Sequence, residues 1–244
     1  MVVIVLSTCV ADGGADSHRD ASVRRTVSGS GARRNLTTMV VVDVELPSPA
    51  DVLCSVVLLQ PLPRAVFLDD LRSESSGVGP SPASVTLFAG QRVEALAELA
   101  EEQTVLLHTT ATAAAATTTH APAAAVVVAT VWLTLHTRYH RAVAGGALVP
   151  PVEIDHPQVF VACGASAANG LPPSCRSTPR HGDAPSLQLC TQELVTTWTA
   201  KGYAVGEPVY IAGITRGDTT HLPAVLFATI ACTAAAFVWV ARGI

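Results

Sequence analysis

The stretch LPAVLFATIACTAAAFVWVA, residues 222–241, is twenty residues long and carries no charge. At a rise of about 1.5 Å per residue, a helix of this length matches the roughly 30 Å hydrocarbon core of a bilayer. Eight of its residues are Leu, Ile, Val or Phe, and together they favour insertion by about 2–5 kcal/mol. Trp239 and Arg242 mark a water interface, and the positive end is expected to face the cytosol. The sequence therefore predicts a transmembrane helix at 222–241, a cytosolic end at 242–244 and a lumenal N-terminal domain.

Two features of this stretch have alternative explanations. An apolar run of this length can also form the buried helix of a soluble core. Small residues recur at every fourth position, which lets two helices pack closely in lipid; they are Ala224, Ala228, Cys232 and Ala236. Plain alanine richness produces the same pattern, so the spacing leaves a partner helix open.

A second uncharged stretch, residues 103–137, contains three histidines, Pro122 and many threonines. Its apolar part, VVVATVWLTL at 126–135, is too short to cross a bilayer as a helix. Its β-branched residues favour a strand instead. We therefore expect a lumenal strand here, preceded by a low-complexity Ala/Thr loop at 108–125.

The N-terminal part is expected to lie outside the folded domain. Residues 1–11 are apolar but lack the positive region of a secretory signal, so they are interpreted as a truncated signal or apolar segment. Residues 12–38 place five arginines among Ser, Gly, Ala and Thr, a composition that predicts a disordered tail; the arginines are Arg19, Arg24, Arg25, Arg33 and Arg34. The chain's net charge of −4 gives no reason to expect a nucleic-acid partner.

Residues 39–218 are expected to form the lumenal domain. Alternating and continuous apolar runs predict strands at 39–46, 53–59, 65–68, 85–89, 126–140, 158–163 and 208–214. An amphipathic pattern predicts one helix at 91–102, and Gly/Pro/Ser-rich stretches predict loops at 73–84 and 164–186. Many short strands with irregular loops predict a mainly β, sandwich-like domain carrying one C-terminal transmembrane helix.

Four cysteines lie in this domain: Cys54, Cys163, Cys175 and Cys190. None belongs to a Cys-x-x-Cys pair, which argues against a zinc site. Two disulfides among the four would suit an oxidising lumen, and the sequence leaves their pairing open. Asn35-Leu36-Thr37 is an N-glycosylation acceptor that is usable only in the same compartment.

The sequence does not assemble an active site. Pro80 interrupts the glycine pattern at 77–80 and removes an amide that a phosphate would need. His136 and His140 are four residues apart but have no obvious third metal ligand. The acidic pairs at 43–45 and 69–70 fit solvated strand edges as well as they fit a metal-bound sugar donor. We therefore expect no catalytic residue, no cofactor and no metal.

Three blocks of sequence carry a resemblance to a known family. The first is LPRAVFLD at 62–69, with Pro63, Phe67 and Asp69. The second is LHTRYHR at 135–141, and it is followed by PQVFVAC at 157–163; its residues are Arg138, Tyr139, His140 and Cys163. The third is GDTTH at 217–221, with Gly217 and His221, directly before the apolar stretch. Together they resemble the PIG-X family, the accessory subunit of glycosylphosphatidylinositol (GPI) mannosyltransferase I.

The sequence departs from the family pattern at three positions. Ala65 stands where the family tends to have glycine, Ala142 where a proline follows the Arg-Tyr-His signature, and Thr215 where a proline precedes the glycine. The Ala/Thr stretch at 111–125 has the character of an insertion. These differences affect the loops more than the assignment.

The resemblance implies a single-pass protein of the endoplasmic reticulum membrane with a lumenal N-terminal domain. It implies a non-catalytic subunit that stabilises or regulates a multi-pass, PIG-M-like catalytic partner, which adds the first mannose to the anchor precursor. On this view the motif residues contact the partner or hold the domain together.

Two other functions fit the same composition. A type I surface glycoprotein with an adhesion or binding ectodomain would have the same layout but would reach the cell surface. A lumenal hydrolase would require a hydrogen-bonded Ser–His pair in a pocket.

Overall fold

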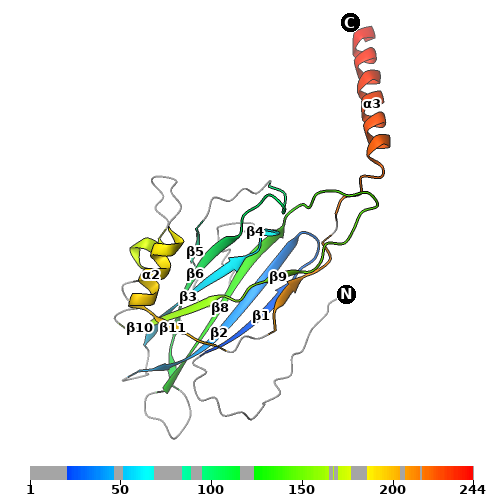
Figure 1. Ribbon diagram of the computed structural model, residues 1–244. Coiled ribbons are helices and arrows are strands. Elements are labelled where there is room, and N and C mark those ends of the chain that lie inside the picture. The colour runs from blue at the N-terminus through cyan, green and yellow to red at the C-terminus, as the bar shows by residue number, and fades with distance from the viewer. Residues whose placement is uncertain are drawn as a thin grey trace.

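Two antiparallel β-sheets pack face to face in the computed structural model (Figure 1). The structure describes residues 21–46, 52–68, 84–88, 95–115, 124–164, 167, 170–176, 186–203, 207–214 and 216–243. Sheet 1 has the strand order β1-β2-β8-β4, with β7 also paired to β8: β1 (Ala21–Ser28), β2 (Arg33–Glu45), β4 (Val66–Leu68), β7 (Ala114–Ala115) and β8 (Ala124–Thr137). Sheet 2 has the order β11-β10-β3-β6-β5: β3 (Leu53–Leu62), β5 (Ser84–Leu87), β6 (Gln103–Thr112), β10 (Gln158–Cys163) and β11 (Thr199–Lys201). A third, two-stranded sheet joins β9 (Val152–Ile154) to β12 (Val209–Ile211). The predicted mainly β sandwich is confirmed.

The inner face of sheet 1 is built by strict alternation along its two long strands. On β2 the even-numbered residues Leu36, Val40 and Val42 are buried between the sheets, while their odd-numbered neighbours face outward. β8 pairs with β2 along thirteen positions and buries its odd-numbered residues, such as Val131 and Leu135. Successive side chains of a strand point to opposite faces, so this sheet has one apolar face toward the core.

Sheet 2 is covered on both faces. One face joins the core between the sheets, and helix α2 (Leu187–Thr197) packs on the other through Cys190 and Leu194. β3 lies in the middle of this sheet, and seven consecutive residues from 54 to 60 are buried. Burial on both sides explains why this strand has a continuous apolar run instead of an alternating one.

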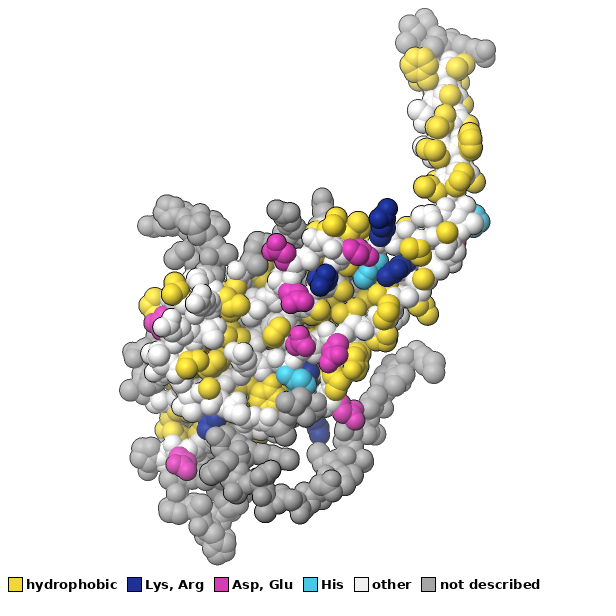
Figure 2. Space-filling model, viewed as in Figure 1, with side chains coloured by type: hydrophobic (Ala, Val, Ile, Leu, Met, Phe, Trp, Pro, Cys, Tyr) yellow, Lys and Arg dark blue, Asp and Glu magenta, His cyan; other side chains and the backbone are white. Residues whose placement is uncertain are grey.

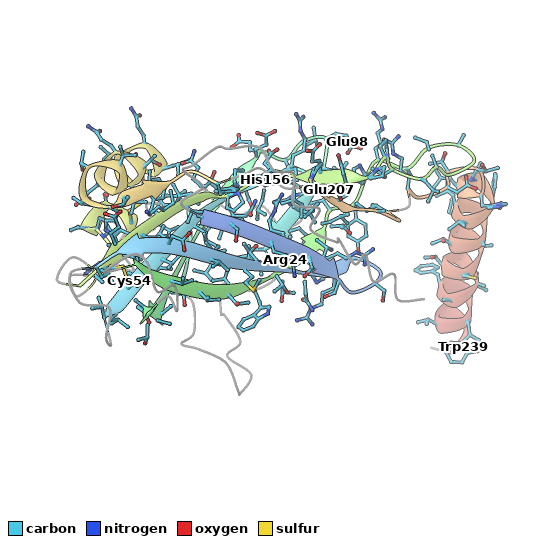
Figure 3. All side chains as sticks on the ribbon, turned by 90° about the horizontal axis from the view of Figure 1, so that it is seen from below. Arg24, Cys54, Glu98, His156, Glu207 and Trp239 are labelled. Atoms are coloured by element: carbon cyan, nitrogen blue, oxygen red, sulfur yellow. A yellow bond between two sulfur atoms is a disulfide. The ribbon has the colours of Figure 1, made fainter. Side chains whose placement is uncertain are left out.

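Two disulfides lie at the end of the domain that is far from the C-terminal helix. Cys54 on β3 is bonded to Cys163 on β10, directly opposite in the strand register. Cys175, in the short helix η1 (Pro173–Cys175), is bonded to Cys190 on α2. Figure 3 shows Cys54 at one end of the domain and the helix bearing Trp239 at the other. The structure thereby gives the disulfide pairing that the sequence left open.

The C-terminal helix α3 (Leu222–Gly243) stands away from the domain as a column of exposed apolar side chains (Figure 2). Its segment Leu222–Val240 has a mean hydropathy of 2.0 and none of it is buried. By length and composition this helix could span a membrane, as predicted. An apolar helix without a covering surface is not the buried core helix of the alternative explanation.

The predicted disordered tail at 12–38 is wrong for residues 21–38, because this part forms all of β1 and the start of β2. The Ser/Gly-rich segment at 28–31 forms the hairpin turn between β1 and β2, in which Gly29 has φ +98° and Gly31 has φ +67°. A Cβ on Gly29 would lie 2.9 Å from the carbonyl oxygen of Arg33, so glycine is required there. Pairing of β2 with β8 supplies the burial that composition alone did not predict.

Arg25 anchors this N-terminal hairpin to the rest of the domain. Its Nη1 donates hydrogen bonds to the carbonyl oxygens of Ile154 at 3.1 Å and Asp155 at 2.7 Å. Its Nη2 lies 3.3 Å from Nδ1 of His156. Burial lowers the pKa of Arg25 from its ordinary value, and the nearby Asp155 and Glu153 partly oppose this. A residue assigned from sequence to a solvated tail therefore ties β1 to the turn between β9 and β10.

We expect Arg25→Ala to lower the free energy of unfolding by about 1.5–3 kcal/mol, since it removes charge-assisted hydrogen bonds at a half-buried position. Arg24→Ala is the matched control because Arg24 is exposed on the opposite face of β1; its effect should stay within about 0.5 kcal/mol. Denaturant unfolding of the full chain in detergent, followed by tryptophan fluorescence, measures both. Equal losses in the two variants would contradict the anchoring role.

Two local predictions in the middle of the chain are also wrong. Residues 95–102 of the predicted helix at 91–102 form turns, because the amide of Ala97 donates to the carbonyl of Tyr139 at 3.0 Å instead of to a helical neighbour; residues 91–94 are outside the described ones. The predicted loop at 108–125 is wrong in part, since 108–112 extend β6 beside β3, 114–115 form β7 and 124–125 begin β8; residues 116–123 are outside the described ones. Threonine suits the pleated surface of a strand even in a low-complexity segment.

Candidate functional site

The first two motif blocks meet at the end of sheet 1. β4 pairs with the end of β8, so that Phe67 lies opposite His136. Just beyond the strand, the amide of Arg138 donates to the carbonyl of Ala65 at 2.8 Å. The ring centroids of Phe67 and His136 are 5.5 Å apart. Segments separated by about seventy residues in sequence thus form one surface.

Arg138 is a buried member of this surface. It is only 3% exposed, and its guanidinium carbon lies 5.0 Å from the ring centroid of Phe67. Burial lowers the pKa of Arg138 from its ordinary value. A guanidinium over an aromatic face is held by the ring's quadrupole and by packing of its stem. The geometry supports a structural role for Arg138, which holds β4 against the end of β8.

His140 and Glu98 continue the same surface into the turn at 95–102. Nδ1 of His140 lies 3.4 Å from Oε1 of Glu98, which also accepts the amide of Arg141 at 3.2 Å. Hydrogen bonds from the backbone of Glu98 and of Arg141, together with His140, lower the pKa of Glu98. The Nε2 atom of His140 is buried and has no hydrogen-bond partner within the described part of the chain.

Tyr139, between the buried Arg138 and the largely buried imidazole of His140, points to solvent and is 84% exposed. Leu99, in the turn whose Ala97 is bonded to the Tyr139 carbonyl, is 75% exposed. A fixed backbone that presents a large aromatic and a leucine to solvent is typical of a protein contact surface.

The third block closes the domain next to α3. The Asp218 carboxylate accepts the amides of Gly145 at 2.9 Å and Thr220 at 2.8 Å. Val143 pairs with Asp218 as an isolated parallel bridge, and a Cβ on Gly217 would lie 3.2 Å from that of Ala142. The amide of Leu222 then donates to the carbonyl of Thr219 at the start of α3. We call this arrangement the clasp: residues 142–146 with residues 217–220.

Residues 65–67, 98–99, 138–141 and the clasp extend from the end of sheet 1 to the start of α3, and we call them the motif cluster. The glycines of the clasp have a backbone reason to be there, since Gly145 and Gly146 have φ of +79° and +60°. Figure 3 shows Glu98 on the side of the domain nearer to the C-terminal helix.

We expect the clasp to loosen when Asp218 is replaced by alanine. Hydrogen bonds from Thr220, and then from Gly145, lower the pKa of Asp218. Because this pKa is lowered, the stabilising contribution of the ionised Asp218 carboxylate is complete at neutral pH and is lost only as pH falls through the lowered pKa. Hydrogen exchange of the full chain at neutral pH should therefore become faster around 143–147 and 218–222, with β3 unchanged. Asp218→Asn, which keeps one oxygen acceptor, should show a smaller effect; no change with alanine would contradict the clasp.

The remaining predicted residues lie in different places. The carbonyl of Pro63 accepts the amide of Val66 in the turn before β4. His221 is exposed beside the first turn of α3, and Asp69 is outside the described residues. Cys163, in contrast, belongs to the distal disulfide with Cys54 and not to the motif cluster. Asn35 lies exposed on the outer face of β2.

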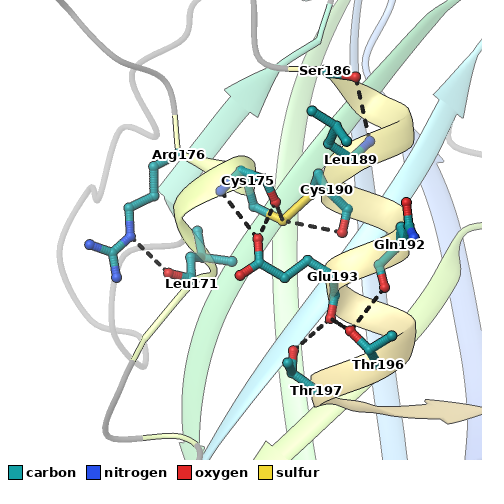
Figure 4. Close-up of a disulfide and its surroundings, with 11 residues drawn as sticks. Leu171, Cys175, Arg176, Ser186, Leu189, Cys190, Gln192, Glu193, Thr196 and Thr197 are labelled. Carbon is teal, nitrogen blue, oxygen red and sulfur yellow. Dashed lines mark hydrogen bonds between the residues drawn. A yellow bond between two sulfur atoms is a disulfide. The ribbon is translucent and has the colours of Figure 1, made fainter.

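Helix α2 is joined to η1 by a disulfide (Figure 4), and the sequence analysis did not predict this helix. Ser186 caps the helix by accepting the amide of Leu189 at 3.4 Å. Glu193 accepts the amide of Ser174, and the Arg176 side chain donates to the carbonyl of Leu171 at 2.8 Å. The spacing of Cys190, Leu194 and Trp198 by four residues is the sequence signal that indicates this helix.

One serine and one histidine approach each other among the described residues. Ser84 Oγ and His108 Nδ1 are 3.5 Å apart, but His108 Nε2 is buried without a hydrogen-bond partner among those residues. A catalytic histidine needs an acid on its second nitrogen to hold the reactive tautomer. Burial, and then the charge of Arg176, lower the pKa of His108. Within the same residues there is no group of three His, Cys, Asp or Glu that could hold a metal ion.

In a comparison with protein families, residues 30–244 match the family model described as PIG-X / PBN1. The matched part runs from the β1–β2 turn through α3 and includes every block of the motif cluster. Neither the curated proteins nor the solved structures gave a match.

Proposed function

The chain belongs to the PIG-X/PBN1 family, which implies an accessory role in GPI-anchor mannosylation, and on this premise we propose that it is the non-catalytic, stabilising subunit of GPI mannosyltransferase I. Its partner is a multi-pass, PIG-M-like catalytic subunit that adds the first mannose of the anchor. The observation that carries this proposal is that distant motif blocks meet: the first pairs with the second, and the third pairs with the segment just after the second, with Tyr139 and Leu99 exposed.

The proposed location is the endoplasmic reticulum membrane, with the β-sandwich in the lumen. Arg242 follows the apolar helix, and positive residues favour the cytosolic side. Two disulfides in the domain suit an oxidising compartment. The described part of the chain has one helix that could cross a membrane, and we assign the chemistry on the lipid-linked sugar to the partner.

The proposed mechanism is stabilisation by binding. A subunit that binds the folded partner and not its unfolded form shifts the partner toward the folded state by mass action. The motif cluster would contact lumenal loops of the partner, and α3 would pack beside its helices. The accessory subunit thereby raises the amount of active enzyme without taking part in the reaction.

Depletion of the chain tests the proposal at the level of the cell. We expect the level of the catalytic subunit and the amount of GPI-anchored protein at the cell surface to fall together, and both to return when the chain is restored. Affinity purification in mild detergent should recover a multi-pass mannosyltransferase. Unchanged levels of both, with the chain itself at the cell surface, would favour the adhesion glycoprotein instead.

Substitution of the two exposed motif residues tests the contact surface. We expect Tyr139→Ala to weaken capture of the catalytic subunit by roughly 30-fold, the effect of losing about 2 kcal/mol at a binding hot spot, and Leu99→Ala to weaken it less. Leu189→Ala is the matched control, because Leu189 is an exposed leucine on α2 at the distal end. Capture that is equally strong in all three variants would place the contact elsewhere.

A further inference from the structure

The outer face of sheet 1 exposes an apolar surface. Trp132 and Val128, which point outward from β8, are 54% and 51% exposed. Val41 and Met39, which point outward from β2, lie beside them in the register. Sheet 2 has α2 over its outer face, whereas no described helix or strand buries these residues of sheet 1. Apolar side chains that lie side by side on an open sheet face form a surface on which another group can pack.

The glycosylation acceptor lies on this same face. Asn35 and Thr37 are two residues apart on β2, so both side chains point outward while Leu36 is buried between the sheets. The Asn35 side chain is exposed, and its Oδ1 accepts a hydrogen bond from Thr134 at 3.3 Å. Its amide nitrogen, the atom that would carry a glycan, makes no hydrogen bond within the described part of the chain. The bond to Thr134 holds the side chain at the surface with that nitrogen available.

Trp132 is the aromatic neighbour of this acceptor. Thr37 lies directly opposite Trp132, and Asn35 lies opposite Thr134, two residues further along β8. Diagonal neighbours on one face of a sheet have Cα atoms roughly 7–8 Å apart, which is within reach of an aromatic side chain. The indole is a large apolar ring, and the C–H face of a sugar can pack on it as another apolar group would.

We propose that Asn35 carries an N-linked glycan whose first sugars pack on Trp132 and cover the outer face of sheet 1. This rests on the lumenal orientation of the proposed function. The glycan is attached to the chain before β2 pairs with its neighbours, so the position of Asn35 within a strand does not prevent the modification. A glycan over Trp132 and Val128 then leaves the exposed side chains of Tyr139 and Leu99 as the open surface for the catalytic subunit.

The composition of the chain makes the modification easy to assign. The chain contains two asparagines, Asn35 and Asn169, and the second is followed by Gly170 and Leu171, which do not complete an acceptor. Removal of N-glycans from the full chain, expressed in eukaryotic membranes, should therefore increase its gel mobility by the amount of one glycan. Asn35→Gln and Thr37→Ala should abolish the change, and Thr37→Ser, which keeps the acceptor, should retain it.

Packing on Trp132 is tested by thermal unfolding of the purified chain in detergent. Enzymatic removal of the glycan should lower the midpoint of the natural sequence by about 2–4 °C, the shift that accompanies a loss of about 1 kcal/mol in a domain of this size. The same treatment should leave the midpoint of Trp132→Thr unchanged. An equal decrease in both proteins would overturn the packing.

Protection from protease in sealed microsomes separates failure of this inference from failure of the proposed function. A protected domain without a glycan overturns the glycan at Asn35 and leaves the lumenal orientation intact. A domain that is digested without detergent and carries no glycan overturns both.

Discussion

Replacing Cys54 and Cys163 together by alanine is expected to lower the free energy of unfolding of the domain by about 4–5 kcal/mol. The disulfide closes a loop of 109 residues, and the cost of opening a loop in the unfolded chain grows with its length. It also joins two neighbouring strands of sheet 2, β3 and β10, at directly opposite positions near their ends. Denaturant unfolding of the full chain in detergent measures the loss.

The second disulfide supplies the comparison. Cys175 and Cys190 close a loop of 15 residues, for which the same argument predicts about 3 kcal/mol. Cys232→Ala is the control, since this cysteine is free and lies on α3 outside the domain. If removing the Cys54–Cys163 disulfide lowers the free energy of unfolding no more than removing the Cys175–Cys190 disulfide, chain entropy is not the main contribution of these disulfides.

Elements that carry their own periodicity were predicted well from the sequence. β10 was predicted at its observed residues, and the continuous run of β3 and the alternation after residue 39 in β2 were found because burial there leaves a direct pattern. The apolar run of α3 needs no partner to be recognised. In these segments local pattern and tertiary environment agree, which is the condition for prediction from a single sequence.

The errors lie where long-range contacts decide the local structure. Arg25 was assigned to a tail because its own neighbours are small and polar, yet its hydrogen bonds are to residues about 130 positions away. The amide of Ala97 donates a hydrogen bond to the carbonyl of Tyr139 and not to a carbonyl of a local helix. The motif blocks were recognised one by one, but their meeting depends on the pairing of β4 with β8 and of Val143 with Asp218. A single sequence, without related sequences to compare, does not indicate which of its distant segments pair.

A glycan placed at the motif cluster is expected to abolish capture of the catalytic subunit. Glu102→Asn creates an acceptor at residues 102–104, because Gln103 and Thr104 already follow. Glu102 is exposed at the start of β6, next to the turn that carries Leu99 and Glu98. A glycan is bulky and hydrated, so it would hold a protein surface away from this end of the domain. We expect at least a tenfold loss in the amount of partner recovered with the modified chain.

The matched variant is Thr26→Asn, which creates an acceptor at residues 26–28 with Val27 and Ser28 already in place. Thr26 lies on the outer face of sheet 1, opposite Thr37, on the surface that we assign to the glycan at Asn35. Its glycan should leave capture unchanged. In both variants a second mobility shift reports how much of the chain is modified, and Glu102→Asn combined with Thr104→Val retains the substitution without the acceptor.

The two glycans together locate the contact. Loss with Glu102→Asn alone fits a partner that binds at the motif cluster, where Tyr139 and Leu99 are exposed. Loss with Thr26→Asn alone would place the partner on sheet 1 and contradict both the contact surface and the covering glycan. If neither glycan weakens capture, the β-sandwich domain contributes little binding energy. The contact would then reside in α3, whose exposed apolar length could associate with other membrane helices only by close packing and hydrogen bonding.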